Sequence, residues 1–374
     1  MKKVLYITYD GILEPLGYSQ ILSYLIHLSK HNYIKIISVE KKKDLLNVDY
    51  FNKINNILKE KNKKWKFLNY TDNKFGKIIL ILKLLFFIFF NLMNKKINIV
   101  HARSYITGLL VYILKFFFNF HFIFDIRGFW IDERIDWGLW RKKSIKYFFF
   151  RFMENKIYNK SNTIVTLTND SKNLIHNNAF KRKEIDIFVI PTCLNIENKT
   201  FLPKKRSKIK FTHLGSIGSR YNFLTYINVM KNINNNSKFF LSIINKGEHN
   251  KIKKIINDNS ININNCEIKY VYPYDIDKEL RETDFGLFFP VHGYYLNAYF
   301  PTKLGEFLSN GVPVITNKIN KHVDQIIIDN NVGIVIDDLN KIDYNYLSDK
   351  INLKLNDKDI RDRCKSVASK YLDI

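Results

Sequence analysis

Two charged side chains near the C-terminal end of the sequence, Lys303 and Glu306, have types and a spacing that suit ligand binding. They lie three residues apart in the run PTKLGEFLSNGVPVIT (residues 301–316), so on a helix they share one face. A carboxylate there can accept two hydrogen bonds from a ribose diol, and an ammonium near the amides of a helix N-terminus can meet a diphosphate. For these two residues alone, a surface ion pair is the simpler interpretation.

The residues around this pair predict a short helix that leads into a buried strand. After Pro301, Thr302 has the residue type of an N-cap, and Gly311 followed by Pro313 is typical of a helix end. The apolar side chains of the helix take the side away from the charged pair: Leu304, Phe307 and Leu308. We expect Pro301 and Thr302 to contact the same ligand as Lys303.

A second group of charged residues follows the strand predicted at His121–Asp125. Asp125, Arg127, Asp132 and Glu133 are the candidates for catalytic positioning of a sugar or its acceptor. Carboxylates and an arginine packed around Gly, Phe and Trp residues suit a partly buried site that orients hydroxyls or phosphate. The alternative is an ion-pair cluster that only closes the loop.

Two further candidates, His101 and Arg103, stand at the end of a neighbouring predicted strand. Because the carboxyl ends of parallel strands meet at one edge of a sheet, these side chains are expected to face the same crevice as Asp125. We therefore expect His101, Arg103 and Trp130 to contact an acceptor. A lone histidine is more often structural.

The loop after the first predicted strand, residues 9–20, carries Gly11 and Gly17. A glycine-bearing turn lets the backbone approach a ligand, and the next helix points its N-terminal amides at an anion. The loop lacks the GxGxxG pattern, so it gives no support to dinucleotide binding. We expect Gly11 and Gly17 to approach the donor.

Short apolar strands alternate with helix-length segments along the whole chain. This alternation predicts parallel sheets with helices on both faces, and because it repeats after residue 205 it predicts two doubly wound α/β domains. The predicted strands are Val4–Thr8, Tyr33–Val39, Trp65–Leu68, Ile97–His101, His121–Asp125, Thr163–Leu167, Ile187–Ile190, Ile209–His213, Phe239–Ile244, Glu267–Val271, Phe285–Phe289, Val312–Thr316 and Gly333–Ile336.

Length and cysteine usage limit the class of protein. The chain has 374 residues, 46% of them hydrophobic, which is enough for two cores. Cys193, Cys266 and Cys364 lie far apart, so they predict neither a disulfide framework nor a zinc site and fit a reducing cytoplasm. The opening run MKKVLYITYDG has no small-residue cleavage site, so we interpret it as a strand rather than a signal peptide.

The formal charge of +25 has two explanations. Much of it could be solvated surface lysine, or it could attract an anionic partner. Zinc-finger spacing, an RNP-like aromatic motif and a basic region leading into heptads are all missing from the sequence, so nucleic acid is the weaker candidate. An anionic membrane surface with a lipid-phosphate acceptor is the stronger one.

Two helical segments are candidates for contact with such a membrane. Lys77–Met93 is apolar nearly all round, but its uninterrupted apolar stretch is shorter than the ~20 residues a spanning helix needs, so we predict a buried or membrane-dipping helix. Arg141–Tyr158 combines an apolar stripe with basic residues, which suits a bilayer surface, although a core-facing helix with a solvated basic side is the simpler interpretation. The stripe consists of Ile145, Phe148, Phe149, Phe152, Met153 and Ile157.

Three motifs, taken together and in order, resemble family 4 glycosyltransferases of GT-B fold, in particular bacterial members that build cell-surface polysaccharides. They are the opening ITYDGILEPLGYSQILSYL, the middle HARSYITG with FIFDIRGFWIDERIDWGLW, and PTKLGEFLSNGVPVIT. The resemblance runs from residue 1 to about residue 340. It implies two Rossmann-like domains that face a central cleft.

The resemblance also gives roles to the domains. Residues 1–190 are expected to form the acceptor-binding domain and residues 208–355 the domain that binds the nucleotide sugar. Residues 191–207, which carry two prolines and a Lys-Lys-Arg cluster, are the predicted linker. Residues 356–374 are predicted to be helical, and in this architecture such a helix often packs back on the N-terminal domain.

The resemblance implies transfer of a sugar with retention, by an enzyme of the hexosyltransferase class (EC 2.4), without a catalytic metal or another cofactor. Glu306 matches the second Glu of the family's EX7E signature, which holds the ribose. The first Glu of that signature falls on Ala298, so its carboxylate contact to the donor sugar is absent.

The resemblance also bears on the diphosphate. The family's Arg and Lys after the first C-terminal strand fall near Ser216 and Tyr221, and Arg220 offers a cation one place away. The residues expected to neutralise the diphosphate are therefore Arg220 and Lys303 with the backbone of Gly11, Gly215 and Ser216.

These implications predict transfer to a saccharide or a polyprenyl-diphosphate-linked saccharide during assembly of capsule, lipopolysaccharide or exopolysaccharide. The protein is expected to lie in the cytoplasm, peripheral on the inner face of the plasma membrane, with no nucleic acid as partner. A GT-B sugar-nucleotide epimerase, which needs no separate acceptor, and a non-catalytic family member are the alternatives.

Overall fold

The computed structural model describes residues 1–14, 17–60, 64–93, 96–179, 185–194, 196, 208–218, 220–233, 239–259, 265–272 and 275–373. The chain divides into two compact units. The first takes in Met1–Cys193 and Asn297–Tyr299, and the second takes in Leu194–Leu296 and Phe300–Asp373. Most of the predicted linker 191–207 lies outside the described residues, so the predicted domain limits stay a prediction.

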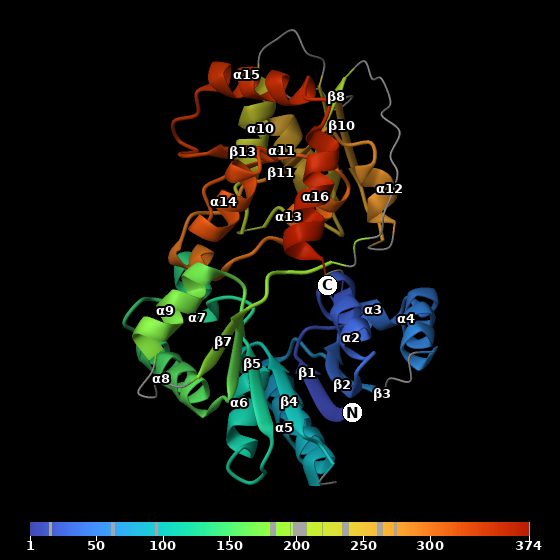
Figure 1. The fold of residues 1–374 in the computed structure, drawn as a ribbon, viewed down its shortest axis with the longest axis vertical. Coiled ribbons are helices and arrows are strands. Elements are labelled where there is room, and N and C mark those ends of the chain that lie inside the picture. Colours follow the sequence, from blue (N-terminus) through green and yellow to red (C-terminus); the bar gives the residue numbers. More distant parts are fainter. Residues whose placement is uncertain are drawn as a thin grey trace. The chain divides into compact units, whose positions relative to one another are not determined.

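The first unit is built on a seven-stranded sheet (Figure 1) in the order β3-β2-β1-β4-β5-β6-β7, with every neighbouring pair parallel. Its strands are β1 (Lys2–Thr8), β2 (Asn32–Glu40), β3 (Lys64–Asn69), β4 (Ile99–Arg103), β5 (His121–Asp125), β6 (Thr163–Thr166) and β7 (Asp186–Val189). In this doubly wound order the direction in which successive strands are added to the sheet reverses between β1 and β4, and such sheets bind ligands at this switch point. The register there aligns Thr8 with Arg103, and Arg103 with Asp125.

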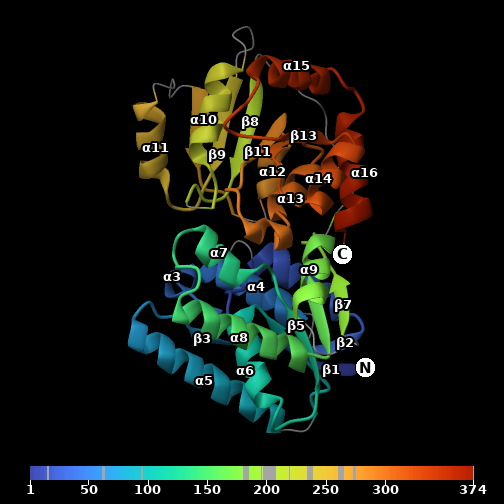
Figure 2. The ribbon, with the colours of Figure 1, turned by 90° about the vertical axis from the view of Figure 1, so that its left-hand side faces the viewer.

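The helices of the first unit bury apolar stripes on this sheet. On α5, for example, Leu80, Leu84, Ile88 and Leu92 repeat at helical spacing and join the core of the unit. Figure 2 shows α5, α6 and α8 on one face of the sheet. The helices are α2 (Ser23–Leu28), α3 (Lys42–Leu45), α4 (Val48–Glu60), α5 (Lys74–Met93), α6 (Tyr105–Leu114), α7 (Trp130–Asp136), α8 (Ile145–Lys160) and α9 (Asn169–Ala179).

The second unit repeats the doubly wound plan with six parallel strands in the order β10-β9-β8-β11-β12-β13. The strands are β8 (Ile209–Leu214), β9 (Phe239–Ile244), β10 (Cys266–Lys269), β11 (Phe285–Phe288), β12 (Val314–Asn317) and β13 (Gly333–Ile336). The helices are α10 (Phe223–Asn232), α11 (His249–Asp258), α12 (Ile276–Leu280), α13 (Thr302–Ser309), α14 (Lys321–Asp329), α15 (Tyr344–Leu355) and α16 (Ile360–Leu372).

Each strand predicted from the sequence corresponds to a strand of the structure, and the predicted fold of two doubly wound α/β units is confirmed. Three of the predicted ranges match to the residue: His121–Asp125, Phe239–Ile244 and Gly333–Ile336. Their apolar and β-branched residues are mostly buried in β5 and β9, whereas in the edge strand β13 Ile334 alone is buried.

Helix α13 ends as predicted and begins one residue differently. Its N-cap residue is Pro301, so the prediction that Thr302 caps the helix is wrong, since Thr302 already lies in the first turn. At the other end Gly311 has a φ of 69°, its amide donates to the Leu308 carbonyl, and the Val312 amide donates to the Phe307 carbonyl. This Schellman motif satisfies the last carbonyls of the helix and turns the chain into β12.

The two helical segments that are candidates for membrane contact both leave apolar side chains exposed, and only α8 differs from its simpler, core-facing interpretation. Helix α5 buries one stripe only, and among the described residues it is the one helix long and apolar enough to cross a membrane by length and composition. Helix α8 begins at Ile145, and the stripe expected to face the core is largely exposed. The face of α8 that is buried carries Glu154, Ile157 and Tyr158 instead.

Candidate functional site

Lys303 stands in the first turn of α13, where its ammonium is buried with no hydrogen-bond partner among the described residues. Its Nζ lies 3.5 Å from the centre of the Tyr221 ring. Gly215 faces the same side chain, with a φ of 102°, and a Cβ at Gly215 would lie 3.2 Å from the Lys303 Cε. Glycine therefore allows the turn after β8 to approach the lysine in a backbone conformation that other residues rarely adopt.

Glu306 lies one turn after Lys303 on α13. Burial raises the pKa of Glu306 to about 8, against the opposing charge of Lys303. Burial likewise lowers the pKa of Lys303 to about 7, against the opposing charge of Glu306. In the described part of the chain no side chain or amide donates to the Glu306 carboxylate. Both groups can therefore still pair with a ligand.

The loop after β8 offers two amides beside this pair. The Gly215 amide, which we expected to meet a diphosphate, is engaged, because it donates to the Ile244 carbonyl at 2.8 Å. The Ile217 amide donates to Glu248 Oε2 at 2.9 Å. The amides of Ser216 and Gly218 have no acceptor within the described ranges, so they are the donors left for an anion.

The other predicted donor residues lie in or just after this loop and at the start of α13. Ser216 and Arg220 are exposed, while Pro301 and Thr302 are buried at the start of α13. His213, at the end of β8, is buried with Nε2 at 3.1 Å from the Gly215 carbonyl oxygen. Burial and the charge of Lys303 hold the pKa of His213 well below its usual range, so the imidazole is neutral and supports the turn.

In the first unit, Asp125 lies at the centre of the residues that end β4 and β5. Its carboxylate oxygens are 3.5 Å from His101 Nε2, 3.8 Å from Arg103 Nη1 and 3.8 Å from Arg127 Nη1. Burial acts to raise the pKa of Asp125, but the charges of Arg127 and Arg103 and the His101 contact outweigh it and lower the pKa. Asp125 is therefore an ionised carboxylate and a poor proton acceptor at neutral pH.

These contacts leave hydrogen-bonding capacity unused. Asp125 Oδ1, His101 Nε2, Arg103 Nε and Arg127 Nε are buried without a hydrogen-bond partner among the described residues. Ion pairs longer than 3.4 Å do not satisfy such groups. The predicted grouping of His101, Arg103, Asp125 and Arg127 is present, and it could bind polar groups of a ligand.

The loop after β1 reaches this group through Gln20. Gln20 Oε1 accepts from Arg103 Nη2 at 2.7 Å and from Arg127 Nη2 at 3.4 Å. Asp10 Oδ2 lies 3.6 Å from Arg103 Nε. One amide oxygen thus bridges the two arginines, although they carry like charges.

The glycines of this loop shape the backbone and leave no amide open at Gly11. The Gly11 amide donates to Glu14 Oε1 at 3.3 Å, and the buried Glu40 accepts from the Ile12 amide at 2.8 Å. A Cβ at Gly17 would lie 2.1 Å from the Gly11 carbonyl oxygen. Because carboxylates of the protein already occupy these donors, the expected contact of the Gly11 amide with a diphosphate is not available in this structure.

Three residues of α7 that were predicted as site residues contact partners other than Asp125. Asp132 is buried and pairs with Arg151 of α8. Glu133 lies against Gly128, where a Cβ would be 3.0 Å from its Oε1. The Trp130 ring packs against Tyr105, Trp140 and Phe150 at centroid distances of 5.9, 5.0 and 5.3 Å. These contacts give Asp132 and Trp130 a packing role.

Ala298, where the resemblance would place a Glu, is fully buried in the core of the first unit. It ends a turn of 3-10 helix (Tyr294–Ala298). Thr168 Oγ1 donates to the Asn297 carbonyl next to it. The position therefore offers neither a carboxylate nor space for one.

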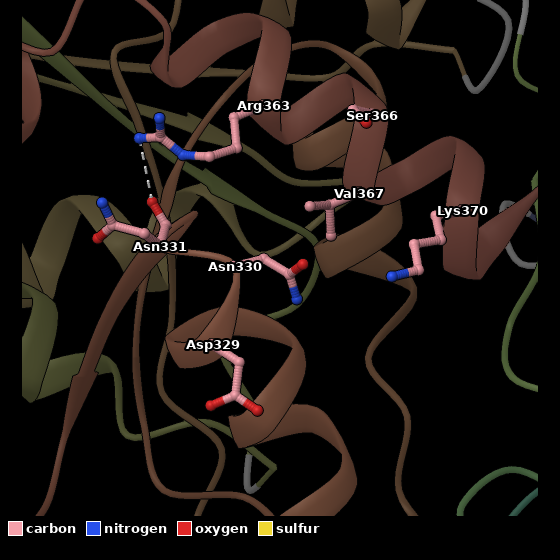
Figure 3. A pocket seen from close by; sticks show the side chains of 7 residues that line it. All are labelled: Asp329, Asn330, Asn331, Arg363, Ser366, Val367 and Lys370. Atoms are coloured by element: carbon pink, nitrogen blue, oxygen red, sulfur yellow. Dashed lines mark hydrogen bonds between the residues drawn. The ribbon is translucent and has the colours of Figure 1, made fainter.

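Within the described ranges, no three His, Cys, Asp or Glu side chains are grouped as metal ligands would be. A cavity of about 450 Å³ lies between the end of α14 and α16 (Figure 3). Its Arg363 already pairs with Asp357 and donates to the Asn331 carbonyl, and none of the predicted site residues lines it.

Four residues near the predicted groups have roles that depend on the tertiary fold and could not be predicted from the sequence. Tyr221 and Gln20 contact the predicted residues Lys303 and Arg103, and Glu40 and Glu248 accept from the amides of Ile12 and Ile217 next to predicted residues, but none of the four stands at an informative spacing in the sequence. The one available signal was at Tyr221, which aligns with a cation of the resembled family.

Comparisons with known proteins bear on the fold and the second unit. Residues 227–358 match the family described as glucosyltransferase 3-like, C-terminal domain. No curated protein sequence matches the chain significantly. Among solved structures, sucrose-phosphate synthase from Thermosynechococcus elongatus superposes with a TM-score of 0.71 at 10% identity, over 100% of this chain and 95% of the other.

Two further structures superpose over 100% of this chain. A glycosyltransferase from Rickettsia africae gives a TM-score of 0.69 at 16% identity, over 94% of its own chain. HepE from Anabaena, in complex with UDP and glucose, gives 0.70 at 11% identity, over 96% of its own chain. The two parallel sheets of seven and six strands, with this similarity over the whole length, establish a GT-B fold of two Rossmann-like units. The fold is the one that these structures share, and residues 227–358 resemble the C-terminal domain of a glucosyltransferase family.

Proposed function

We propose that the chain is a retaining family 4 glycosyltransferase. It would move a sugar from a nucleoside-diphosphate sugar to a saccharide or a lipid-linked saccharide during assembly of capsule, lipopolysaccharide or exopolysaccharide. The observation that carries the proposal is the buried ammonium of Lys303, which has no hydrogen-bond partner among the described residues. A buried cation is costly unless an anion compensates it, and a diphosphate is such an anion.

The donor would bind along α13 and the loop after β8. Glu306 would accept the two hydroxyls of the ribose, and Lys303, Arg220 and the amides of Ser216 and Gly218 would hold the diphosphate. HepE from Anabaena has been solved with UDP and with UDP-glucose, which supports uridine as the base to test first.

The demanding step is departure of the nucleoside diphosphate from the anomeric carbon. The bond from that carbon to the diphosphate oxygen breaks, a bond to the acceptor oxygen forms on the same face of the sugar, and the proton of the acceptor hydroxyl passes to the departing diphosphate. Negative charge develops on the leaving oxygen, and fixed cations and amides stabilise it without reorganising. Lys303, Arg220 and the two amides would perform this task, rather than a metal.

The acceptor would bind at the group around Asp125 in the first unit. An ionised carboxylate with two arginines and a histidine offers both acceptors and donors to sugar hydroxyls. We assign Asp125, Arg127, Arg103 and His101 to positioning of the acceptor. A lipid-linked acceptor would place the reaction in the cytoplasm, at the inner face of the plasma membrane.

The test is incubation of the purified full chain with a panel of nucleotide sugars and a membrane lipid extract. We expect a sugar to appear on a lipid-extractable saccharide, and we expect Glu306→Ala and Asp125→Asn to reduce that transfer. An isomerised donor formed without acceptor would support the epimerase instead. Absence of both products, together with absence of nucleotide binding, would overturn the proposal.

A further inference from the structure

Two helices of the first unit present apolar side chains to the outside. On α5 they are Phe75, Ile78, Phe86, Phe90 and Met93, and on α8 they are Ile145, Phe148, Phe149 and Phe152. Each of these residues is more than half exposed, and Ile145 is 90% exposed. Soluble proteins rarely expose a continuous patch of this kind without a binding role.

Helical geometry places both stripes on the side away from the sheet. At 100° per residue, Phe86 on α5 lies about opposite the buried Leu84 and Ile88. On α8, Phe152 lies about opposite Glu154, which is buried. Since α5 and α8 cover the same face of the sheet (Figure 2), their exposed stripes face the same side of the unit.

The segment after α6 joins the two stripes. Phe116 and Phe117 are more than half exposed. The Phe118 ring lies 5.3 Å from that of Phe89 on α5, and Lys160 Nζ of α8 lies 4.4 Å from the Phe116 ring centre. The exposed residues of α5, Phe116–Phe117 and α8 therefore form one surface, here named the aromatic–basic face.

The charges on this face are of one sign. Residues 74–124 contain no Asp or Glu, and the one acidic residue of α8, Glu154, is buried and paired with Arg151. Exposed basic side chains border the apolar residues: Lys74, Lys83, Arg141, Lys142, Lys143, Lys146 and Lys156. Such a surface repels a second copy of itself and attracts an anionic one.

We infer that the aromatic–basic face binds an anionic phospholipid bilayer, with the phenylalanine rings in the interfacial region and the lysines on the headgroups. Helix α5 lies on the surface rather than crossing the bilayer, since Leu80, Leu84, Ile88 and Leu92 are already committed to the core. This inference goes beyond the proposed transfer reaction, because it concerns a surface that contains none of the residues assigned to donor or acceptor.

The test is flotation of the full chain with vesicles of phosphatidylcholine alone or of phosphatidylcholine with 30% phosphatidylglycerol, without any nucleotide sugar. We expect binding to the anionic vesicles only, weakened by salt. Replacing Lys142, Lys143 and Lys146 with Gln should weaken binding roughly a hundredfold. Replacing Phe148, Phe149 and Phe152 with Ser should weaken it by at least about tenfold.

Matched controls lie on the second unit. Gln replacements at Lys251, Lys253 and Lys254, which are exposed on α11, remove the same charge, and Ser at Ile328 and Leu353 removes exposed apolar area. These variants should bind vesicles like the wild type, and all variants should bind UDP and melt like it. The inference is overturned if the α8 variants bind vesicles as well as the controls do, or if the wild type ignores anionic vesicles and instead self-associates or captures an acidic protein.

Discussion

The Lys303 ammonium lies 3.5 Å from the centre of the Tyr221 ring, at the position where the resembled family places a second cation. The face of an aromatic ring favours the charged form of the lysine by about 0.5–2 kcal/mol, while burial favours the neutral form. An incoming diphosphate would shift this balance to the charged form. Lys303 can therefore gain its charge when an anion binds, and the uncharged Tyr221 ring beside it needs no counter-ion.

Lys303→Met should weaken UDP binding and raise stability at the same time. Loss of a charge-assisted contact of about 1.5–3 kcal/mol corresponds to roughly 10- to 100-fold weaker binding by calorimetry. Removal of a buried amine that lacks a hydrogen bond should raise the Tm by roughly 2–4 °C per kcal/mol gained. Lys251→Met, at an exposed position on α11, is the control and should change neither value.

The stability gain of Lys303→Met should depend on pH. The pKa of Lys303 is about 7 in the folded protein against an ordinary 10.5. Its contribution to stability is therefore present above pH ~10.5 and lost as the pH falls through about 7. The Tm difference between variant and wild type should be largest at pH 6.5 and shrink steadily toward pH 9.5. A difference that is constant with pH would mean that the lysine titrates normally.

Glu306→Ala should abolish recognition of the ribose diol and leave the fold intact. If Glu306 accepts both hydroxyls, the wild type should bind UDP about tenfold or more tightly than 2′-deoxy-UDP, and the variant should bind the two alike. Calorimetry with both ligands separates this effect from a general loss of affinity. Equal discrimination by wild type and variant would assign the ribose to another residue.

Glu306→Gln gives the opposite pH dependence to the lysine variant. The pKa of Glu306 is about 8 in the folded protein against an ordinary 4.5. Its contribution to stability is complete below pH ~4.5 and is lost as the pH rises through about 8. Because Gln does not titrate, the Tm of the variant relative to the wild type should rise between pH 5 and pH 8.5. Thermal melts at half-unit steps would reveal a flat difference if the carboxyl were already ionised at pH 5.

The strands were predictable from the sequence because strands buried on both faces consist of short apolar runs bounded by polar loops. The side of α8 that faces the core could not be predicted in this way. Its exposed stripe contains Phe148, Phe149 and Phe152, and its inner face carries Glu154, which accepts from Tyr105 at 2.7 Å and pairs with Arg151. Hydrophobic spacing identifies an apolar stripe but cannot tell whether the core or an external partner covers it.

Lys303 and Glu306 could be predicted as a pair, whereas much of the rest of the site could not. Lys303 and Glu306 are close in sequence, so helical geometry alone places them on one face. The grouping of Arg103, Asp125 and Gln20 depends on which strands are neighbours in the sheet. The sequence predicted that the ends of β4 and β5 lie close together, but not that Gln20 reaches them. Carboxylates from other parts of the chain, such as Glu40 and Glu248, accept hydrogen bonds from some backbone amides of these loops. They therefore decide which amides remain available to a ligand.

The two buried aspartates of the first unit should behave differently when they are replaced with Asn. Asp132 pairs with Arg151, which also donates to Glu154 at 2.7 Å, so Asp132→Asn leaves that charge network incomplete. We expect about 1–3 kcal/mol of destabilisation, measured by denaturant unfolding, with unchanged transfer activity per folded molecule. Asp125→Asn removes the carboxylate that His101, Arg103 and Arg127 surround, and it should lower activity at least about tenfold in addition to any loss of stability.

The contrast between these two variants decides whether the acidic residues after β5 form one site or two. If Asp132 only holds α7 against α8, kcat and KM of Asp132→Asn should match the wild type at a temperature where both are fully folded. For Asp125→Asn, the loss should appear in the KM for the acceptor and in kcat, while UDP affinity stays unchanged, because the donor residues all lie in the second unit. A normal Tm with lost activity in Asp132→Asn would return Asp132 to the catalytic group, and weakened UDP binding in Asp125→Asn would show that Asp125 acts on the donor rather than on the acceptor.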